Sequence, residues 1–168
     1  MAVSVRGRRA GNRIRRRPRV LDGYRRLLVP VADNSESEQA IDVAARLAAE
    51  HGSSITAVTV VEVPPVLPVD AHMHEEERRA HALLRRAAAL AESYGVTVSL
   101  ETVRGRDAAS ALVREVVARN IELVVLGAPR AQGRKRSLAV FGDTVEHVLK
   151  HAPCRVMIVG APMPLQAA

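Results

Sequence analysis

Residues 25–48 read RRLLVPVADNSESEQAIDVAARLA, and this stretch decides the fold. Its first seven residues, Arg25 to Val31, form a short apolar run after a basic start, which suits a buried strand. Ser35 and Glu38 have the spacing of a capping box, in which a hydroxyl and a carboxylate bind the first free amides of a helix. Behind them comes an apolar helix face with the spacing i, i+3, i+4, i+7, made of Ile41, Ala44, Ala45 and Ala48. The stretch therefore predicts a strand followed directly by a helix.

The same alternation continues to the end of the chain. Apolar, β-branched runs predict further strands at residues 54–61, 96–103, 122–126 and 155–159. Helical spacing predicts further helices at residues 75–94, 107–120 and 142–151. Gly52 should end the first helix and Asp107 should cap the third. In the last helix, the residues expected to face inward are Val145, Val148, Leu149 and Ala152.

Strands that are separated by helices indicate a parallel sheet covered on both faces. The predicted fold class is therefore α/β: a doubly wound, five-stranded parallel sheet with helices on both faces. Ligands of such folds bind beyond the carboxyl ends of the strands. The loops after residues 31, 61 and 126 converge there, so we expect the functional site among them.

The composition describes one domain with an aliphatic core. The chain has 168 residues, of which 48% are hydrophobic, and it contains no Trp and very few other aromatic residues. No apolar run approaches the roughly 18 residues that a membrane span needs. Cys154 is the only cysteine, so a disulfide within the chain is excluded, and we expect a cytoplasmic protein.

The basic charge is concentrated in the first residues. Residues 1–20 contain eight arginines and no acidic residue, so the rest of a chain whose net charge is +7 carries −1. We expect a disordered Arg-rich tail at residues 1–22, a folded domain at 23–161 and a short C-terminal tail at 162–168. The tail is either a solvated extension, one arising from an upstream start codon, or a basic arm that touches nucleic acid or anionic lipid.

The loops exclude several protein classes that share this sheet. A phospho-acceptor receiver needs clustered acidic residues after the first and third strands, and Asp33 with Asn34 matches poorly. Adenylating ATP pyrophosphatases have a Ser-Gly-Gly type of loop after the first strand, whereas residues 32–35 read ADNS. A dinucleotide-binding fingerprint would also place its glycines there. In this chain the glycines follow the fourth strand instead, within residues 127–144, GAPRAQGRKRSLAVFGDT.

Three stretches resemble the universal stress protein family. They are residues 25–48, residues 107–129 (DAASALVREVVARNIELVVLGAP) and residues 141–159 (FGDTVEHVLKHAPCRVMIV). The last is the most specific, because its helix ends in His-Ala-Pro-Cys and runs into a final apolar strand. Within the family, the chain looks most like the soluble domains attached to amino-acid permeases. The resemblance implies an adenine-nucleotide alpha hydrolase-like fold and a non-enzymatic role in stress response or regulation.

Family members that bind ATP carry a glycine signature, and this chain departs from it. The signature is Gly, two residues, Gly, nine residues, and then Gly followed by Ser or Thr. Its glycines admit phosphates close to the backbone at a helix N-terminus. Gly127 keeps the first place and Gly142 the third, but Arg130 replaces the second glycine. Residues 131–141 make the interval two residues too long.

The end of the signature is also altered. Asp143 replaces the hydroxyl residue, and Thr144 comes one position late. Asp143 can cap its own helix and so supplies an anion that repels a phosphate. Four cations on the loop could compensate: Arg130, Arg134, Lys135 and Arg136. The phosphate site is therefore predicted to be degenerate, binding ATP or AMP weakly, with a monophosphate or a cyclic nucleotide as an alternative to the triphosphate.

The resemblance places the adenosine contacts on the first two strands. The matching positions are Pro30, Val31 and Ala32 after the first strand and Val60 near the end of the second. Binders usually have Asp where Ala32 stands, to meet the ribose. Asp33 follows one residue later and is a further candidate contact. We expect the base pocket to be better preserved than the phosphate site.

No catalytic or metal-binding constellation emerges from the sequence. Three histidines, His72, His74 and His81, lie near one another without a nearby cysteine. His147 and His151 have the i, i+4 spacing of a zinc pair. Near a helix C-terminus, however, we expect their positive charge to interact favourably with the helix dipole and their rings to contact solvent.

Two functional hypotheses therefore remain open. The first is a dimer that senses or sequesters an adenine nucleotide. The second is a nucleotide-free interaction module that regulates a membrane transporter or another partner. In the first, the resemblance implies that two copies pair through the last strand, at Val156, Met157, Ile158 and Val159.

Overall fold

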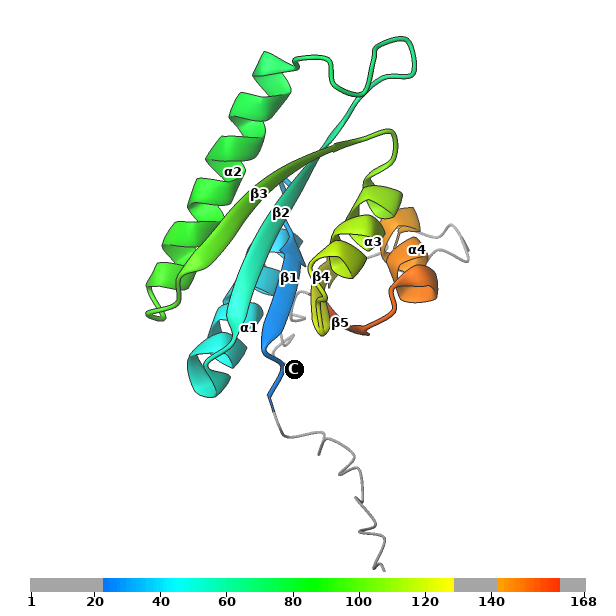
Figure 1. Ribbon diagram of the computed structural model, residues 1–168. Helices are drawn as coiled ribbons and strands as arrows, with labels where there is room; N and C mark the ends of the chain where they lie inside the picture. Colours follow the sequence, from blue (N-terminus) through cyan, green and yellow to red (C-terminus); the bar gives the residue numbers. More distant parts are fainter. Residues whose placement is uncertain (1–22, 129–141, 161–168) are drawn as a thin grey trace, which may run out of the picture.

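The computed structural model describes residues 23–128 and 142–160, which form one α/β unit (Figure 1). Its five strands are β1 (Arg26–Pro30), β2 (Ser54–Glu62), β3 (Val98–Gly105), β4 (Leu123–Ala128) and β5 (Arg155–Gly160). Its four helices are α1 (Ser35–His51), α2 (His74–Glu92), α3 (Ala108–Ala118) and α4 (Asp143–His151). Both predicted tails lie outside the described residues.

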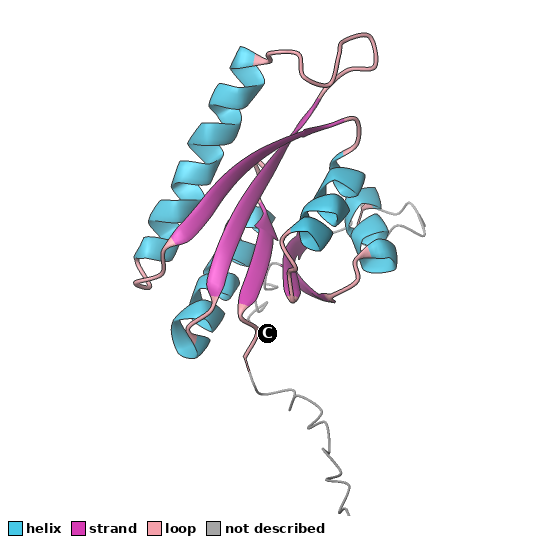
Figure 2. Ribbon diagram, in the orientation of Figure 1, coloured by secondary structure: helices cyan, strands magenta, loops and turns pink. Residues whose placement is uncertain are grey.

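All strands run parallel in a single sheet with the order β3-β2-β1-β4-β5. The helices cover both faces, with α1 and α2 on one and α3 and α4 on the other (Figure 2). This arrangement confirms the predicted doubly wound fold. After β1 the chain winds toward β3, and after β4 it winds toward β5, so the direction of winding reverses between β1 and β4. In open α/β sheets, that reversal is where ligands bind.

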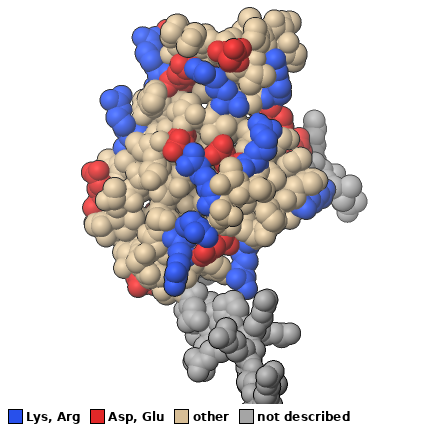
Figure 3. All heavy atoms as spheres, viewed as in Figure 1, with Lys and Arg blue, Asp and Glu red and all other residues tan. Residues whose placement is uncertain are grey.

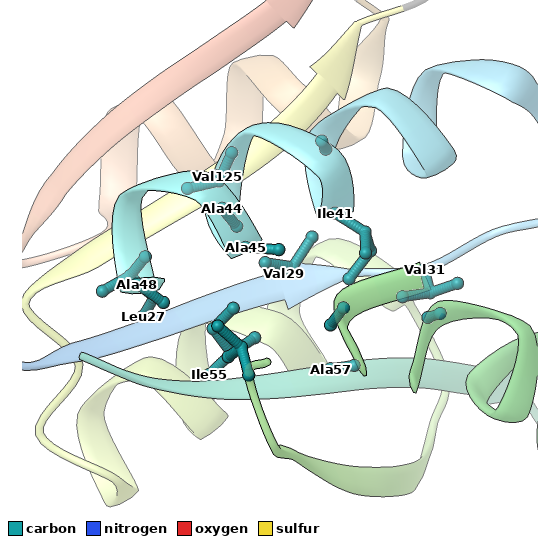
Figure 4. Close-up of a cluster of buried hydrophobic side chains, with 14 of the residues drawn as sticks. Leu27, Val29, Val31, Ile41, Ala44, Ala45, Ala48, Ile55, Ala57 and Val125 are labelled. Carbon is teal, nitrogen blue, oxygen red and sulfur yellow. The ribbon is translucent and has the colours of Figure 1, made fainter. Parts of the chain in front are cut away.

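Two apolar layers hold the helices to the sheet. On the first face, α1 packs mainly on β4 and β1, and its small side chains let the helix approach the sheet closely (Figure 4). The α1 residues Ile41, Ala44, Ala45 and Ala48 are all buried, which confirms the face predicted from their spacing. On the second face, Leu112 and Val116 of α3 pack with Val145 and Val148 of α4. Successive strand residues alternate between the two layers, as the pleat requires.

The start of α1 differs from the capping-box prediction. Asn34 is the N-cap: its backbone is extended, and its side chain accepts a hydrogen bond from Ser37 N at 2.8 Å. Ser35 is the first helical residue, so it cannot serve as the cap. The predicted N-cap of α3 and the predicted end of α1 are confirmed. Asp107 caps α3 by accepting from Ser110 N at 2.7 Å, and Gly52 ends α1 in the left-handed region with φ 67°.

Some element boundaries and one core residue were also predicted wrongly. The second helix begins at His74 and ends at Glu92, and β3 begins two residues later than expected, at Val98. Leu149 is 43% exposed rather than buried. The nine-residue α4 packs along one narrow stripe, which Val145 and Val148 fill, and Leu149 is turned away from it.

β2 and β3 extend beyond the rest of the sheet. They pair with each other as far as Glu62 and Gly105, whereas β1 pairs with β2 only as far as Val58. Backbone groups of β2 past Val58 therefore lie beyond the end of β1, at the edge where a ligand is expected. None of the helices in the described part of the chain has the length and hydropathy needed to cross a membrane.

Candidate functional site

A cavity of about 300 Å³ opens at the carboxyl ends of β1 and β4, where the winding reverses. Elements from both halves of the fold enclose it: the β1–α1 loop, β2, the end of β4, and the first turns of α3 and α4. The described residues that line it are Pro30, Val31, Ala32, Asn34, Ser37, Val58, Val60, Ala108, Leu112, Leu126, Gly127, Gly142, Asp143, Thr144 and Val145.

Most of the predicted site residues meet at this cavity. The structure brings together Pro30, Val31, Ala32, Val60, Gly127, Gly142, Asp143 and Thr144. They come from four separate segments of the chain, so this convergence is a property of the fold rather than of any one motif. Arg130 and the other three loop cations lie outside the described residues.

Asp33 does not join them. Its carboxylate is 3.6 Å from the guanidinium of Arg86 on α2, and its side chain is 82% exposed. Arg86 also pairs with Glu38 of α1. Asp33 lines an adjoining groove of about 510 Å³ between α1 and α2 instead of the cavity. The groove and the cavity share the lining residues Val31, Ala32, Asn34 and Ser37. Its inclusion among the nucleotide contacts is therefore not supported by the structure, because one position along the loop turns the side chain toward the other face of the sheet.

The structure adds lining residues that the sequence analysis missed. They are Asn34, Ser37, Val58, Ala108, Leu112, Leu126 and Val145. The sequence pattern assigns the apolar residues of this set to the core or to strands, and in the structure they also form the walls of the cavity. For Asn34, a signal was present, since an Asn before a helical pattern is a strong N-cap and the cap fixes the loop. Nothing in the local pattern marks Ser37.

In the β1–α1 loop, the backbone groups of Val31 and Ala32 are engaged in internal hydrogen bonds. Val31 N donates to Val58 O at 2.8 Å, and Val31 O accepts from Thr59 Oγ1 at 3.0 Å. Ala32 N donates to Ser37 Oγ at 3.0 Å, and Ala32 O accepts from Asn34 N at 2.9 Å. These bonds hold the start of the loop in place, and they leave no unbonded backbone N–H on Val31 or Ala32 for a ligand.

Val60 supplies a free backbone donor and acceptor. Because Val58 O binds Val31 N, the N–H and C=O of Val58 point toward β1. Backbone direction alternates along a strand, so the same groups of Val60 point the same way. β1 has ended at Pro30, and no backbone group in the described part of the chain pairs with Val60 on that side. Its N–H and C=O therefore face the cavity, which Val60 lines.

Two helix N-termini border the cavity, and they differ in charge. At α3, the carboxylate of Glu62 accepts from Ala108 N at 2.8 Å, and Asp107 accepts from Ser110 N. Hydrogen bonds from the Ser110 side chain and backbone lower the pKa of Asp107, so this carboxylate is ionised at neutral pH. The partial positive charge of α3 is thus already neutralised by two carboxylates.

The N-terminus of α4 has no such cap. Gly142 occupies the N-cap position with φ 82°, a conformation that suits glycine, and no side chain of the described residues caps the helix. The prediction that Asp143 caps its own helix is wrong, because Asp143 is the first helical residue. Its carboxylate instead lines the cavity, where it is the one ionisable side chain among the described lining residues. An anion at α4 would meet free amides and a negative charge together.

The sequence matches a known family over most of its length. The model of the universal stress protein family matches residues 23–160. A universal stress protein of Methanocaldococcus jannaschii is 27% identical over 148 residues, which cover 83% of this chain and 84% of the relative.

Solved structures show the same fold. A universal stress protein from Lactobacillus plantarum is 22% identical, with a TM-score of 0.66 over 82% of this chain and 98% of its own. One crystallised with cAMP gives the same identity and TM-score over 82% of this chain and 97% of its own. One from Archaeoglobus fulgidus in complex with dAMP is 18% identical, with a TM-score of 0.63 over 80% and 97%. The architecture is the adenine-nucleotide alpha hydrolase-like fold, as predicted.

Proposed function

Because the chain belongs to the universal stress protein family, we propose that its cavity binds an adenine nucleotide of low charge, either a nucleoside monophosphate or its cyclic form. The protein then acts in stress response or regulation by binding, without catalysing a reaction. Members of the fold crystallised with cAMP, dAMP and AMP support this choice of ligand class. The single ionisable side chain in the described lining supports a binding role, since acid–base chemistry usually requires a second, partnered group.

The free backbone pair of Val60 carries the proposal. Its C=O can accept from the 6-amino group of adenine while its N–H donates to the neighbouring ring nitrogen. Hydrogen bonds to that edge are how proteins read an isolated base. Val58, Leu112 and Leu126 supply apolar walls for the ring. The base therefore lies against β2, and the phosphate points across the cavity toward α4.

Asp143 sets the limit on ligand charge. Two like charges about 4 Å apart repel by roughly 4 kcal/mol at an effective dielectric constant of 20. The free amides of a helix N-terminus stabilise an anion by only about 0.3–1 kcal/mol at an exposed site. Each further phosphate charge near Asp143 thus costs more than the α4 terminus supplies. The site favours a monophosphate over a triphosphate.

Titration calorimetry with AMP, ADP and Mg-ATP tests this proposal. In the unaltered protein, affinity should fall as ligand charge rises. Asp143→Asn keeps the side-chain shape and removes the charge, so ATP affinity should rise by roughly ten- to a hundredfold. Glu146→Gln is the matched control, because Glu146 lies one turn further along α4 and does not line the cavity. Tighter binding of ATP than AMP by the unaltered protein would contradict the proposal and would implicate the four loop cations.

A nucleotide-free interaction module is the second candidate, and the β2–α2 loop favours it. Val66, Leu67 and Val69 are 88%, 41% and 44% exposed at its tip. Arg106 fixes the loop by donating to the carbonyl oxygens of Val63, Pro64 and Leu67. A rigid, exposed apolar tip is typical of a contact surface. Heat-denaturing purified protein and assaying the supernatant for nucleotide separates the two functions, since only the first predicts release.

We also propose that the protein is a cytoplasmic homodimer. The side chains of Val156, Met157, Ile158 and Val159 on the edge strand β5 are half-buried. An apolar edge strand pairs readily with another strand, and a second copy related by a two-fold axis supplies one. Imaging of a fluorescent fusion would test the location.

A further inference from the structure

β3 lies at one edge of the sheet, and its outer side is free (Figure 1). Val63 N donates to Gly105 O at 2.8 Å, so the backbone groups of Gly105 point toward β2. Backbone direction alternates along a strand, so every second residue, counting back from Arg104, points its N–H and C=O away from the sheet. These residues are Val98, Leu100, Thr102 and Arg104. Among the described residues, no backbone group pairs with them on that side.

The features that usually protect an edge strand are missing from β3. Natural edge strands are short, bulged, interrupted by Pro or marked by free charges, often Lys. β3 has eight residues, none of them Pro or Lys, and all eight pair with β2 in continuous register. Its two charged side chains are engaged within the fold, because Arg104 pairs with Glu77 of α2 and Glu101 pairs with Arg119 after α3. The edge can therefore accept another strand.

The surface beside this edge combines apolar side chains with an unpaired carboxylate. Because Arg104 reaches α2 and side chains alternate along a strand, Leu100 and Thr102 lie on the α2 face as well. Leu100 is 39% exposed. A hollow of about 550 Å³ lies between β3, α2 and the β2–α2 loop, and its lining includes Val69, Asp70 and Thr102. Asp70 forms no ion pair with any other described residue.

We propose that the free edge of β3 binds an extended segment of a partner protein as a sixth strand of the sheet. Main-chain pairing supplies the affinity, and alternate side chains supply the selectivity. On the α2 face, the segment places apolar residues against Leu100 and a Lys or Arg against Asp70. A second copy of β3 offers no such cation, since its Arg104 is held by Glu77. The hollow and the nucleotide cavity share no lining residue, so this inference does not depend on nucleotide binding.

Amide hydrogen exchange of the full chain tests whether the edge is free. The N–H groups of Leu100 and Thr102 should exchange at least about a hundredfold faster than those of Glu101 and Val103, which point toward β2. Similar protection of all four would mean that another part of the chain covers β3, and it would overturn the inference.

Fluorescence anisotropy with a labelled peptide tests strand addition. The probe, Lys-Thr-Val-Thr-Val-Thr-Lys, places its valines and lysines on one face of an added strand in either orientation. It should bind at least about tenfold more tightly than the same peptide with N-methylated amides, which keeps the side chains but cannot pair. Bound probe should also slow the exchange of the Leu100 and Thr102 N–H groups. Equal binding of the two peptides, or no binding, would contradict the inference.

Variants assign the binding to this edge. Leu100→Lys adds a free charge there and should weaken the probe by about tenfold or more. Leu149→Lys is the matched control, because Leu149 is 43% exposed on α4. Asp70→Asn should weaken the probe by about two- to fivefold and leave a peptide with Ser in place of both lysines unaffected. Unchanged binding by folded Leu100→Lys would contradict the inference. Loss of a dimer in that variant, measured by sedimentation, would make a second copy the occupant and would overturn it too.

Discussion

Gly127 has a packing role that is separate from any ligand. A β-carbon at this position of β4 would lie 2.2 Å from the backbone oxygen of Glu36, in the first turn of α1. Only glycine lets β4 and α1 approach so closely, and the first turn of α1 carries Ser37 at the cavity. The first glycine of the nucleotide signature would therefore be required here even if nothing bound.

Gly127→Ala should lower the free energy of unfolding by about 1–3 kcal/mol, because the helix or the strand must shift to admit the methyl group. Gly160→Ala is the matched control, since Gly160 ends the neighbouring strand and its β-carbon would have no neighbour within 4 Å. Urea denaturation of both variants measures the difference. Equal stability of the two would show that the approach of β4 to α1 relaxes easily.

The site was predictable from sequence where the family resemblance could be followed position by position. The resemblance implied Pro30, Val31 and Val60, and all three line the cavity. The direction of Asp33 could not be predicted, because it depends on the exact turn between β1 and α1, and that turn is set by Asn34 acting as the N-cap. Asp143 failed as a predicted cap for the same reason: a shift of one residue at the helix start moved its carboxylate from the helix to the cavity.

At the scale of secondary-structure elements, β5 has one paired and one free edge. Arg155 N donates to Glu122 O, so the backbone groups of Arg155 and of every second residue after it point toward β4. The backbone groups of Val156, Ile158 and Gly160 therefore point outward. Among the residues described, the free edge consists of the N–H and C=O of those three residues.

Ile158→Pro should abolish the dimer in sedimentation velocity and leave a folded monomer, because it removes only an outward N–H. Met157→Pro is the comparison, since it removes an N–H that points toward β4 and should lower the melting temperature. If the unaltered protein sediments as a monomer, β5 is not the dimer interface.

The order of elements was readable from periodicity, since apolar runs and helical spacing differ clearly. The residues at which the elements begin and end were harder to predict. The extension of β2 and β3 past β1 could not be predicted, because it depends on pairing between strands distant in sequence. This extension is what exposes the backbone of Val60.

At the scale of the whole molecule, charge is divided between the folded unit and the segment before it. Basic and acidic side chains are interspersed over the face shown in Figure 3. Ion pairs join many charged side chains of the described residues, for example Arg119 with Glu101 and Glu115. The eight arginines of residues 1–20 have no such balance within their own segment. Long-range attraction to polyanions should thus come from that segment rather than from the folded unit.

Deleting residues 1–22 should leave the melting temperature within a few degrees of the full chain, because residues 24–159 build the two apolar layers described above. The deletion should abolish any salt-sensitive binding to DNA or anionic vesicles. Thermal melting and electrophoretic mobility at two salt concentrations check both parts. A large loss of stability would mean that the segment packs on the fold.

The claim that an adenine nucleotide lies against β2 can be tested directly by following backbone amides in ¹⁵N–¹H correlation spectra as AMP is added. The account predicts the largest shift at Val60, with smaller ones at Gly142 and Thr144, and little change at Arg86 and Leu90 in the groove between α1 and α2. Shifts confined to that groove, or none at all at saturating AMP, would contradict it.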